Sequence, residues 1–484
     1  MFVLTLSLGF FTYIFITYIL RTWRDRRHCA VPGPFPLPVI GNLHLLGEDL
    51  HKDFVSLSKR YGEVFAIYLG SQRFVVVSGA RSIKEVLIEK GPHFAGRPSG
   101  NVKLHIGTAG SRDILASDYG PRLKFMRKLF ARGLNLHGFN KKSMKDNIIK
   151  HADDTIAHLQ EPTMSDPTRC VNLGIVNVIM QIVFDTKLEF DDPLVEKVLE
   201  ALRLLFSAIK PGPEDVFTWL QYFPIKNIRD AKLGTHRRDE ILGKFIQEHR
   251  DSYKHGTIRD ATDAMIATEV EELESGGDKL DNVTFNMLIM DIFAGGMETS
   301  STTILWIMLY LAKYPEKQTK MREELMKVNL KKLDGEESSV LPYTHAVIHE
   351  VQRLACTVST LPHKTTRDTC ICGFEVAKDT PMFVNFYGGM RDENIFNDPN
   401  EFIPERWING DGQYEPNTSY VLPFGAGPRG CPGRQLAVMI LFIFATRIVK
   451  NFSLEEIDGY ENSLDGEFGL TVAPKNLRLK ICRN

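Results

Sequence analysis

The chain of 484 residues contains little cysteine and almost no net charge. Its seven cysteines form an odd, scattered set, which excludes a disulfide framework and indicates reduced thiols in a cytosolic environment. The 59 basic residues nearly balance the 60 acidic ones, so no bulk positive field exists that would attract nucleic acid. Hydrophobic residues make up 43% and charged residues 25%, which excludes a disordered, collagenous or polytopic membrane protein.

One long uncharged run is present, at the N-terminus. Residues 1–20 carry no charge, and about 20 apolar residues suffice to cross a bilayer. Four arginines against one aspartate follow in residues 21–27, which places that end in the cytosol. A cleaved signal peptide is the alternative, but the segment has no basic n-region and no small-residue cleavage site. We therefore expect a transmembrane anchor over 1–20, a basic stop-transfer and Pro-rich linker over 21–42, and one large domain over 43–484.

Hydrophobic periodicity predicts a mainly α fold with small β-sheets. The sequence shows no internal repeat and no low-complexity tract. Residues 64–69 and 73–78 are predicted to form a β-hairpin. The clearest helices are predicted over 80–90, 121–132, 234–254, 281–313, 315–327, 342–354 and 432–451, and further strands over 371–376, 381–386 and 468–482. The last helix carries Pro432 at its predicted first position, where the missing N–H is harmless.

A glycine-rich motif precedes that last helix. Residues 424–433 follow the pattern F-x-x-G-x-R-x-C-x-G, from Phe424 through Arg429 and Cys431 to Gly433. A thiolate at Cys431 is expected to face the positive end of the helix dipole, which would lower the pKa of the thiol. The alternative is a buried free cysteine in a structural loop. By average residue usage, the pattern arises by chance in roughly one chain of this length in ten thousand.

With this motif the sequence resembles the cytochrome P-450 family of haem-thiolate enzymes, whose haem-binding signature it matches. The resemblance implies the P-450 fold, haem b (iron protoporphyrin IX) as cofactor, and Cys431 as the axial ligand of the haem iron. A thiolate ligand pushes electron density onto the iron and favours O–O bond cleavage.

Three further motifs occur in the order that the family has them. Glu350 and Arg353 lie in HEVQR, and Arg406 lies in FIPERW; the resemblance implies that the three form a structural cluster in the core. Residues 295–300 (GGMETS) match the family's oxygen-activation groove, where missing side chains make room for dioxygen and water. The alternative explanation for Gly295 and Gly296 is that they allow close packing between helices.

Comparison with animal microsomal members suggests which cations pair with the haem propionates. They are Arg97, Arg127, His363 and Arg429, and Phe424 completes the predicted haem-binding set. The sequence departs from the family pattern at Leu123, which stands where a tryptophan is usual, so one propionate donor is missing.

Glu298 and Thr299 are the predicted catalytic pair. A hydroxyl beside the reacting oxygen can donate a hydrogen bond, and a nearby acid can recharge it with a proton. The alternative is a helical threonine bonded to its own i−4 carbonyl, with Glu298 paired to a surface cation.

Several segments look most like the animal microsomal group, which contains steroid 17α-hydroxylases and drug- and arene-oxidising enzymes. The expected activity is a monooxygenase that inserts one oxygen atom from O2 into an apolar small molecule (steroid-like, lipid or xenobiotic). Two alternatives remain: a haem-thiolate isomerase or dehydratase acting on a peroxide without a reductase, and a non-catalytic haem-binding membrane protein. The predicted substrate pocket comprises Phe206, Phe293, Gly295, Val358, Leu361 and Leu470.

Electrons must come from a partner, because the chain shows no flavin or nicotinamide fingerprint. We expect NADPH–cytochrome reductase, with cytochrome b5 as a second candidate donor. A run of basic residues is the expected docking face: Arg122, Lys124, Arg127, Lys128 and Arg132. The expected location is the endoplasmic reticulum membrane, with the large domain facing the cytosol.

Overall fold

The computed structural model describes residues 12–13, 16–18, 20, 30–136, 141–160, 165–208, 210, 212–276, 280–329, 339–416 and 419–484. Two compact units divide the chain: the first comprises residues 1–100, 359–399 and 425–430, and the second comprises 101–358, 400–424 and 431–484. Most of the predicted anchor over 1–20 and of the basic segment after it lies outside the described residues. Within the described part of the chain, no helix combines the length and apolar character that a membrane span requires.

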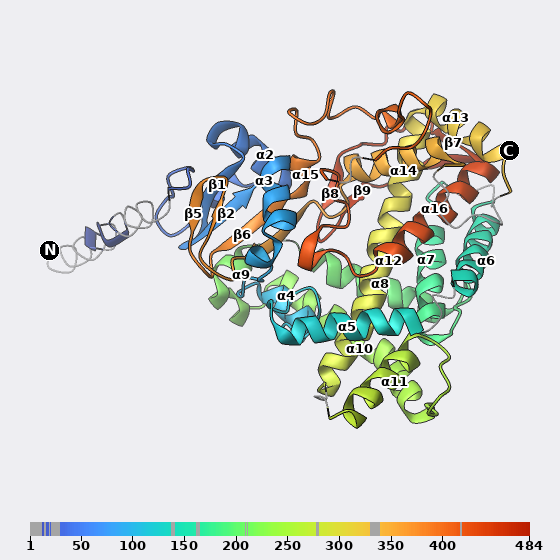
Figure 1. Ribbon diagram of the computed structural model, residues 1–484, viewed down its shortest axis with the longest axis horizontal. Helices are drawn as coiled ribbons and strands as arrows, with labels where there is room; N and C mark the ends of the chain where they lie inside the picture. The colour runs from blue at the N-terminus through green and yellow to red at the C-terminus, as the bar shows by residue number, and fades with distance from the viewer. Residues whose placement is uncertain are drawn as a thin grey trace. The chain divides into compact units, whose positions relative to one another are not determined.

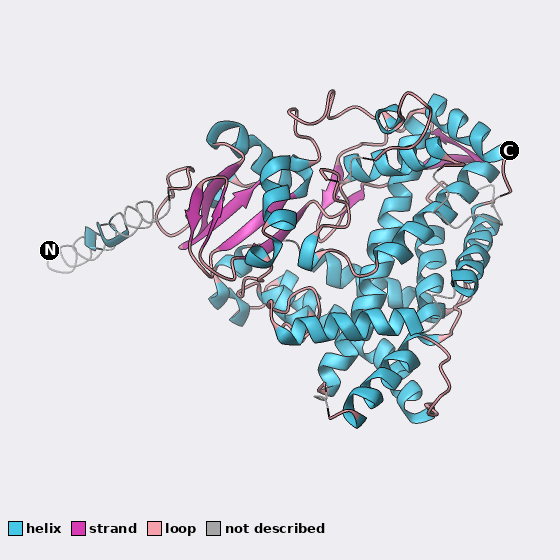
Figure 2. Ribbon diagram, viewed as in Figure 1, coloured by secondary structure: helices cyan, strands magenta, loops and turns pink. Residues whose placement is uncertain are grey.

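A four-stranded sheet dominates the first unit, in the order β1-β2-β6-β3 (Figures 1 and 2). Its strands are β1 (Val64–Leu69), β2 (Gln72–Val77), β6 (Pro381–Asn385) and β3 (Thr360–Lys364). β1 and β2 form the predicted antiparallel hairpin, β6 runs parallel to β2, and β3 is antiparallel to β6. The same unit contains α2 (Leu50–Tyr61), α3 (Ala80–Lys84), α15 (Phe386–Gly389) and the hairpin of β4 (Thr369–Ile371) with β5 (Phe374–Val376).

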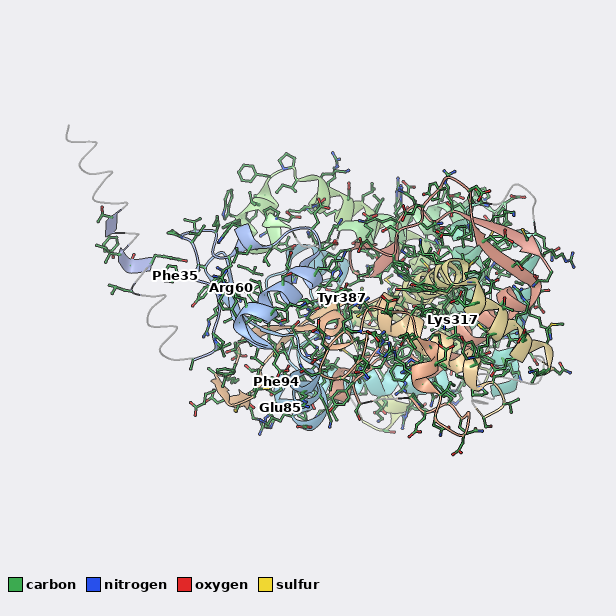
Figure 3. The ribbon with its side chains drawn as sticks, turned by 90° about the horizontal axis from the view of Figure 1, so that it is seen from above. Phe35, Arg60, Glu85, Phe94, Lys317 and Tyr387 are labelled. Atoms are coloured by element: carbon green, nitrogen blue, oxygen red, sulfur yellow. The ribbon has the colours of Figure 1, made fainter. Side chains whose placement is uncertain are left out.

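The predicted helix over 80–90 is interrupted. After α3 the backbone continues as a π turn, η2 (Glu85–Glu89), and then as a 3₁₀ turn, η3 (Gly91–Phe94). Glu85 and Phe94, labelled in Figure 3, begin and end this segment. The glycine-rich loop passes close to it: a Cβ on Gly427 would lie 2.0 Å from the Leu87 carbonyl oxygen, so only glycine fits there.

The second unit is mainly helical (Figure 2). Its helices are α4 (Val102–Gly107), α5 (Pro121–Leu136), α6 (Lys141–Leu159), α7 (Thr168–Phe184), α8 (Pro193–Ala208), α9 (Pro213–Val216), α10 (Lys226–Ser252), α11 (Ala261–Glu274), α12 (Asn282–Lys313), α13 (Pro315–Met326), α14 (Pro342–Ala355) and α16 (Arg434–Asn451). The strands pair as β7 (Phe452–Glu456) with β10 (Leu479–Arg483), and as β8 (Gly466–Phe468) with β9 (Val472–Pro474).

The 32-residue helix α12 passes through the core of this unit. Asp281 caps its start by accepting a hydrogen bond from the Thr284 N–H, at 3.0 Å. The helix is buried on all sides from Ser300 to Ala312, and it packs against α7, α14 and α16 (Figure 1). Burial on all sides explains why its sequence is hydrophobic enough to invite comparison with a membrane span.

Four predicted boundaries were wrong. The strand predicted over 371–376 is instead the hairpin of β4 and β5, which turns at Cys372 and Gly373. The last helix begins at Arg434 with Gly433 as its N-cap, so Pro432 lies in the preceding turn and not at the first helical position. The predicted strand over 468–482 is divided among β8, β9 and β10. The helix predicted to begin at residue 234 begins at Lys226 and continues through Gly234.

Candidate active site

The glycine-rich motif forms a tight loop that leads to Cys431. Gly425 and Gly427 both have left-handed backbone conformations, with φ of 62° and 64°. The Cys431 N–H donates to the Phe424 carbonyl oxygen at 2.8 Å. In addition, the Gly433 N–H donates to the Cys431 sulfur. The motif therefore fixes the direction of the thiol and supplies it with a backbone donor.

Cys431 is solvent-accessible although protein atoms surround it closely. Burial by these atoms raises the pKa of its thiol, and it outweighs the opposing effects of the Gly433 N–H, Arg127 and Arg434. The Gly433 N–H at the start of the last helix does lower the pKa of this thiol, as expected, but burial outweighs it. An accessible thiol within a concave surround suits a metal ligand, because coordination itself deprotonates the sulfur.

Arg127 of α5 is the predicted propionate partner in the second unit. Burial lowers the pKa of its guanidinium, and the attraction of Cys431 opposes that shift. Leu123, one turn earlier, is only 1% exposed, so the residue in the usual tryptophan position contributes to the apolar core. Phe424 has the Arg434 guanidinium over its ring, 6.0 Å from the centroid.

The other three predicted propionate partners lie together in the first unit. The Arg97 Nη1 donates to the Pro362 carbonyl at 2.6 Å, and the Arg429 Nε donates to the Ala95 carbonyl at 2.6 Å. The His363 Nδ1 lies 2.8 Å from the Phe94 carbonyl. Burial, followed by the charges of Arg97 and Arg429, holds the pKa of His363 well below its usual value.

The guanidinium groups of Arg97 and Arg429, each hydrogen-bonded to a backbone carbonyl, lie with the neutral imidazole of His363. This set of donors suits carboxylates. These donors of the first unit suit the two propionates of haem b. In the second unit, the accessible thiol of Cys431 suits its iron, which accepts sulfur.

Glu350 lies at the centre of a largely buried polar cluster in the second unit. The Arg353 Nε and Nη2 donate to its two carboxylate oxygens, both at 2.8 Å, and the Arg406 Nε donates to Oε1 at 3.0 Å. Neither Glu350 nor Arg353 is exposed. The structure thus brings the three predicted core residues together. The single carboxylate of Glu350 pairs with both guanidinium groups, and the cluster ties α14 to η6 (Pro404–Trp407).

Sequence reasoning missed Trp407 as a member of this cluster. Its indole Nε1 donates to the Glu350 Oε2 at 2.9 Å, and the side chain is 3% exposed. A buried indole N–H needs an acceptor, and Trp407 follows Arg406 directly. That adjacency was the available signal.

The two glycines at the predicted oxygen groove on α12 differ in their surroundings. A Cβ on Gly295 would meet no atom within 4 Å, whereas a Cβ on Gly296 would lie 2.8 Å from the Ile179 Cδ1 on α7. Open space therefore adjoins Gly295, while Gly296 permits close packing of α12 on α7.

Glu298 and Thr299 are not hydrogen-bonded to each other. The Thr299 hydroxyl donates to the Gly295 carbonyl at 2.8 Å, which is the alternative that the sequence left open for this residue. Among the described residues, no surface cation pairs with Glu298. Its Oε1 accepts from the Thr471 hydroxyl at 3.0 Å, and burial raises the pKa of its carboxyl.

The predicted pocket residues are distributed over both units. Phe206, Phe293, Gly295, Val358 and Leu470 belong to the second unit, and Leu361 belongs to β3 of the first. Phe293 is only 1% exposed and is part of the packed core. Phe206, Val358, Leu361 and Leu470 are partly exposed.

The basic residues on α5 have acidic neighbours that the sequence did not predict. Lys128 and Arg132 both pair with Glu272 of α11, at 2.6 and 3.2 Å. Arg122 pairs with Asp281 at 3.2 Å. Lys124 instead lies over the Tyr119 ring, 5.3 Å from its centroid.

Comparison with known proteins agrees with these features. The family model described as Cytochrome P450 matches residues 31–481. A steroid 17-alpha-hydroxylase/17,20 lyase of Rana dybowskii is 32% identical, with 98% of this chain and 97% of the relative covered. The enzyme of the same name from Gallus gallus is 33% identical, with 92% and 90% covered. Cytochrome P450 2F2 of Mus musculus is 32% identical, with 88% of each chain covered. The chain therefore belongs to the cytochrome P450 family of haem b-containing monooxygenases.

Proposed function

We propose that this monooxygenase inserts one oxygen atom from O2 into an apolar small molecule (steroid-like, lipid or xenobiotic). The observation that carries the proposal is the open space beside Gly295, which lies within one helical turn of Glu298 and Thr299. The names of the relatives support the substrate class, since two are steroid hydroxylases.

Haem, when bound, supplies dioxygen binding and the oxidising chemistry. Cys431 would hold the iron through its sulfur, and the Gly433 N–H would temper the electron donation of that sulfur by a hydrogen bond. Arg97, His363 and Arg429, with Arg127, would hold the propionates.

Thr299 and Glu298 would manage the protons. The Thr299 hydroxyl is directed at the Gly295 carbonyl. Rotation about the Cα–Cβ bond of Thr299 would direct the same proton towards the O2 substrate in the adjoining space. Glu298, the residue immediately before Thr299, would return a proton to that hydroxyl through water. Burial raises the pKa of Glu298, which brings it closer to the pH at which an acid exchanges protons readily.

Electrons would come from NADPH through NADPH–cytochrome reductase, with cytochrome b5 as a second donor. Lys124 on α5 is the basic residue best suited to meet an acidic flavoprotein, since Arg122, Lys128 and Arg132 already have acidic partners. The uncharged run over 1–20 supports an anchored location on the endoplasmic reticulum membrane, with the catalytic domain in the cytosol.

The test is a reconstitution of the full chain with reductase, NADPH and one probe from each substrate class: progesterone, lauric acid and pyrene. Spectral binding titrations rank the three probes, and product analysis with and without reductase follows. We expect reductase-dependent oxygenated product from at least one probe, carrying label from ¹⁸O₂.

Product that forms without reductase, or that carries no label from ¹⁸O₂, would contradict the proposal. Failure of all three probes to bind would contradict the proposed substrate class. A Thr299→Ala variant serves as the internal control, because it should release more hydrogen peroxide per NADPH consumed.

A further inference from the structure

The Glu298 carboxyl has one hydrogen-bond partner that the catalytic proposal does not use. The Thr471 hydroxyl donates to its Oε1 at 3.0 Å, although the two residues are 173 positions apart in the sequence. Thr471 is 5% exposed. The contact joins the middle of α12 to the turn between β8 and β9.

That turn is held from both sides, which makes Thr471 a fixed donor. The N–H of the next residue, Val472, donates to the Thr357 carbonyl at 2.8 Å. The Val472 carbonyl in turn accepts from the Trp306 indole on α12, also at 2.8 Å. Within the turn, the Gly469 N–H donates to the Thr471 carbonyl at 3.0 Å. The hydroxyl therefore holds its position relative to α12.

Two influences set the pKa of the Glu298 carboxyl, and the Thr471 hydroxyl is one of them. Burial raises the pKa of the carboxyl and is the larger influence, while the Thr471 hydrogen bond lowers it. The helix α12 packs against α7, α10, α13, α14, α16, β7 and β9, and among the described residues no charged side chain acts on the carboxyl. A hydrogen bond to a buried carboxylate stabilises its ionised form.

The neighbouring hydroxyls of Thr299 and Thr303 do not donate to Glu298 in the structure. The Thr299 hydroxyl donates to the Gly295 carbonyl, and the Thr303 hydroxyl donates to the Thr299 carbonyl at 2.8 Å. Each hydroxyl has one proton to donate, so both are engaged within the helix backbone.

We propose that Thr471 is a positioning residue for Glu298: its hydroxyl holds the carboxyl in the orientation from which it exchanges protons near Thr299. The inference rests on the proposed role of Glu298 and adds the group that controls it.

Infrared titration of the holoenzyme tests the inference without a substrate. The carbonyl stretch of protonated Glu298 is identified as the band that Glu298→Gln lacks, and its intensity is followed against pH. Thr471→Val should keep its haem content and shift the titration midpoint upward by about one pH unit, because a donor to the carboxylate is lost. Thr471→Ser should restore the midpoint. Thr268→Val, which removes a buried hydroxyl bonded to the Ala264 carbonyl on α11, should leave the midpoint unchanged.

Peroxide release per NADPH consumed gives the second readout, measured with the probe that the wild type oxidises. Thr471→Val should raise it several-fold in the wild-type background and leave it unchanged in the Glu298→Gln background. Should Thr471→Val fail to incorporate haem, Thr471→Ala carries the same two measurements.

The outcomes separate the two proposals. An unshifted midpoint in Thr471→Val, or an equal rise in peroxide in both backgrounds, would overturn the role of Thr471. Wild-type peroxide release in Glu298→Gln would instead overturn the role of Glu298, while the infrared shift would still report the Thr471 contact.

Discussion

At the scale of single residues, the buried carboxylate of Glu350 is a centre of hydrogen bonding in the second unit. It accepts from Arg353, Arg406, Trp407 and the Ile403 N–H, and neither Glu350 nor Arg353 is exposed to water. Removing one partner of such a buried pair leaves an uncompensated charge, which costs about 3–5 kcal/mol.

Glu350→Ala should therefore abolish stable haem incorporation, since Arg353 would keep a buried charge. Trp407→Phe should be milder: it removes one hydrogen bond to a charged group and lowers the free energy of unfolding by about 1.5–3 kcal/mol. The haem content and the melting temperatures of the two variants test whether Glu350→Ala is the more damaging change. A Glu350→Ala variant that melts no lower than Trp407→Phe would show that the cluster does not stabilise the core.

His345 on α14 gives a prediction about pH. The imidazole stacks on Phe442, its Nε2 is buried without a partner among the described residues, and burial lowers the pKa to about 4. The unfolded chain takes up a proton near pH 6.5, whereas the folded chain does so only near pH 4. Stability is therefore fully present above pH 6.5 and falls as the pH drops towards 4, by about 2 kcal/mol at pH 5 from this residue.

His345→Phe removes that titration and preserves the stacking. Between pH 8 and pH 5, the melting temperature of the variant should fall by less than that of the wild type. A parallel loss in both proteins would mean that His345 does not titrate as described.

These residue-level features were only partly predictable from sequence. Cys431 and Arg429 belong to one short motif, so their association is visible in the chain itself. Trp407 and Thr471 are 57 and 173 residues from the carboxylates that they contact. No local pattern encodes such a pairing, because the fold alone brings the partners together.

At the scale of elements, α12 contains two adjacent glycines with opposite surroundings. Alanine is preferred over glycine in a helix by about 0.8–1 kcal/mol. Gly295→Ala should gain this amount, since its methyl group enters open space. Gly296→Ala should lose stability, because overpacking against the fully buried Ile179 costs about 1–3 kcal/mol. Thermal melting of the two variants should show shifts of opposite sign, and shifts of the same sign would contradict the packing described here.

The helix α5 gives a prediction about electron supply. Lys124→Glu should slow reduction by the reductase several-fold at low ionic strength, and the defect should shrink as salt rises. The equal charge reversal Lys244→Glu on α10 is the control. If reduction kinetics in Lys124→Glu match those of the control at every salt concentration, the reductase does not dock at α5.

Elements with long continuous apolar runs were predicted well, and boundaries set by packing were not. The hairpin of β1 and β2 and the helix α12 lie within one residue of their predicted ranges. The start of α10 was missed because Gly234 suggests a boundary in sequence. In the fold, Gly234 lies inside the helix and allows the backbone of α8 to approach, since a Cβ would come within 2.8 Å of the Leu205 nitrogen.

At the scale of the whole molecule, the signature motif belongs to both compact units. Residues 425–430 lie in the first unit and Cys431 in the second. The predicted propionate partners divide in the same way, with Arg97, His363 and Arg429 in one unit and Arg127 in the other. Local sequence patterns could not predict this division, because each unit is assembled from segments far apart in the chain. Our proposed division into anchor, linker and catalytic domain remains a prediction.

The central claim is that Cys431 supplies the thiolate that defines this enzyme, and the carbon monoxide spectrum of the reduced protein tests it most directly. The wild type should show the red-shifted Soret band of a thiolate-ligated haem. Cys431→His should bind haem and lose that band. A Cys431→His protein that keeps the red-shifted band, or a wild type that lacks it, would contradict the assignment of Cys431 as the axial ligand.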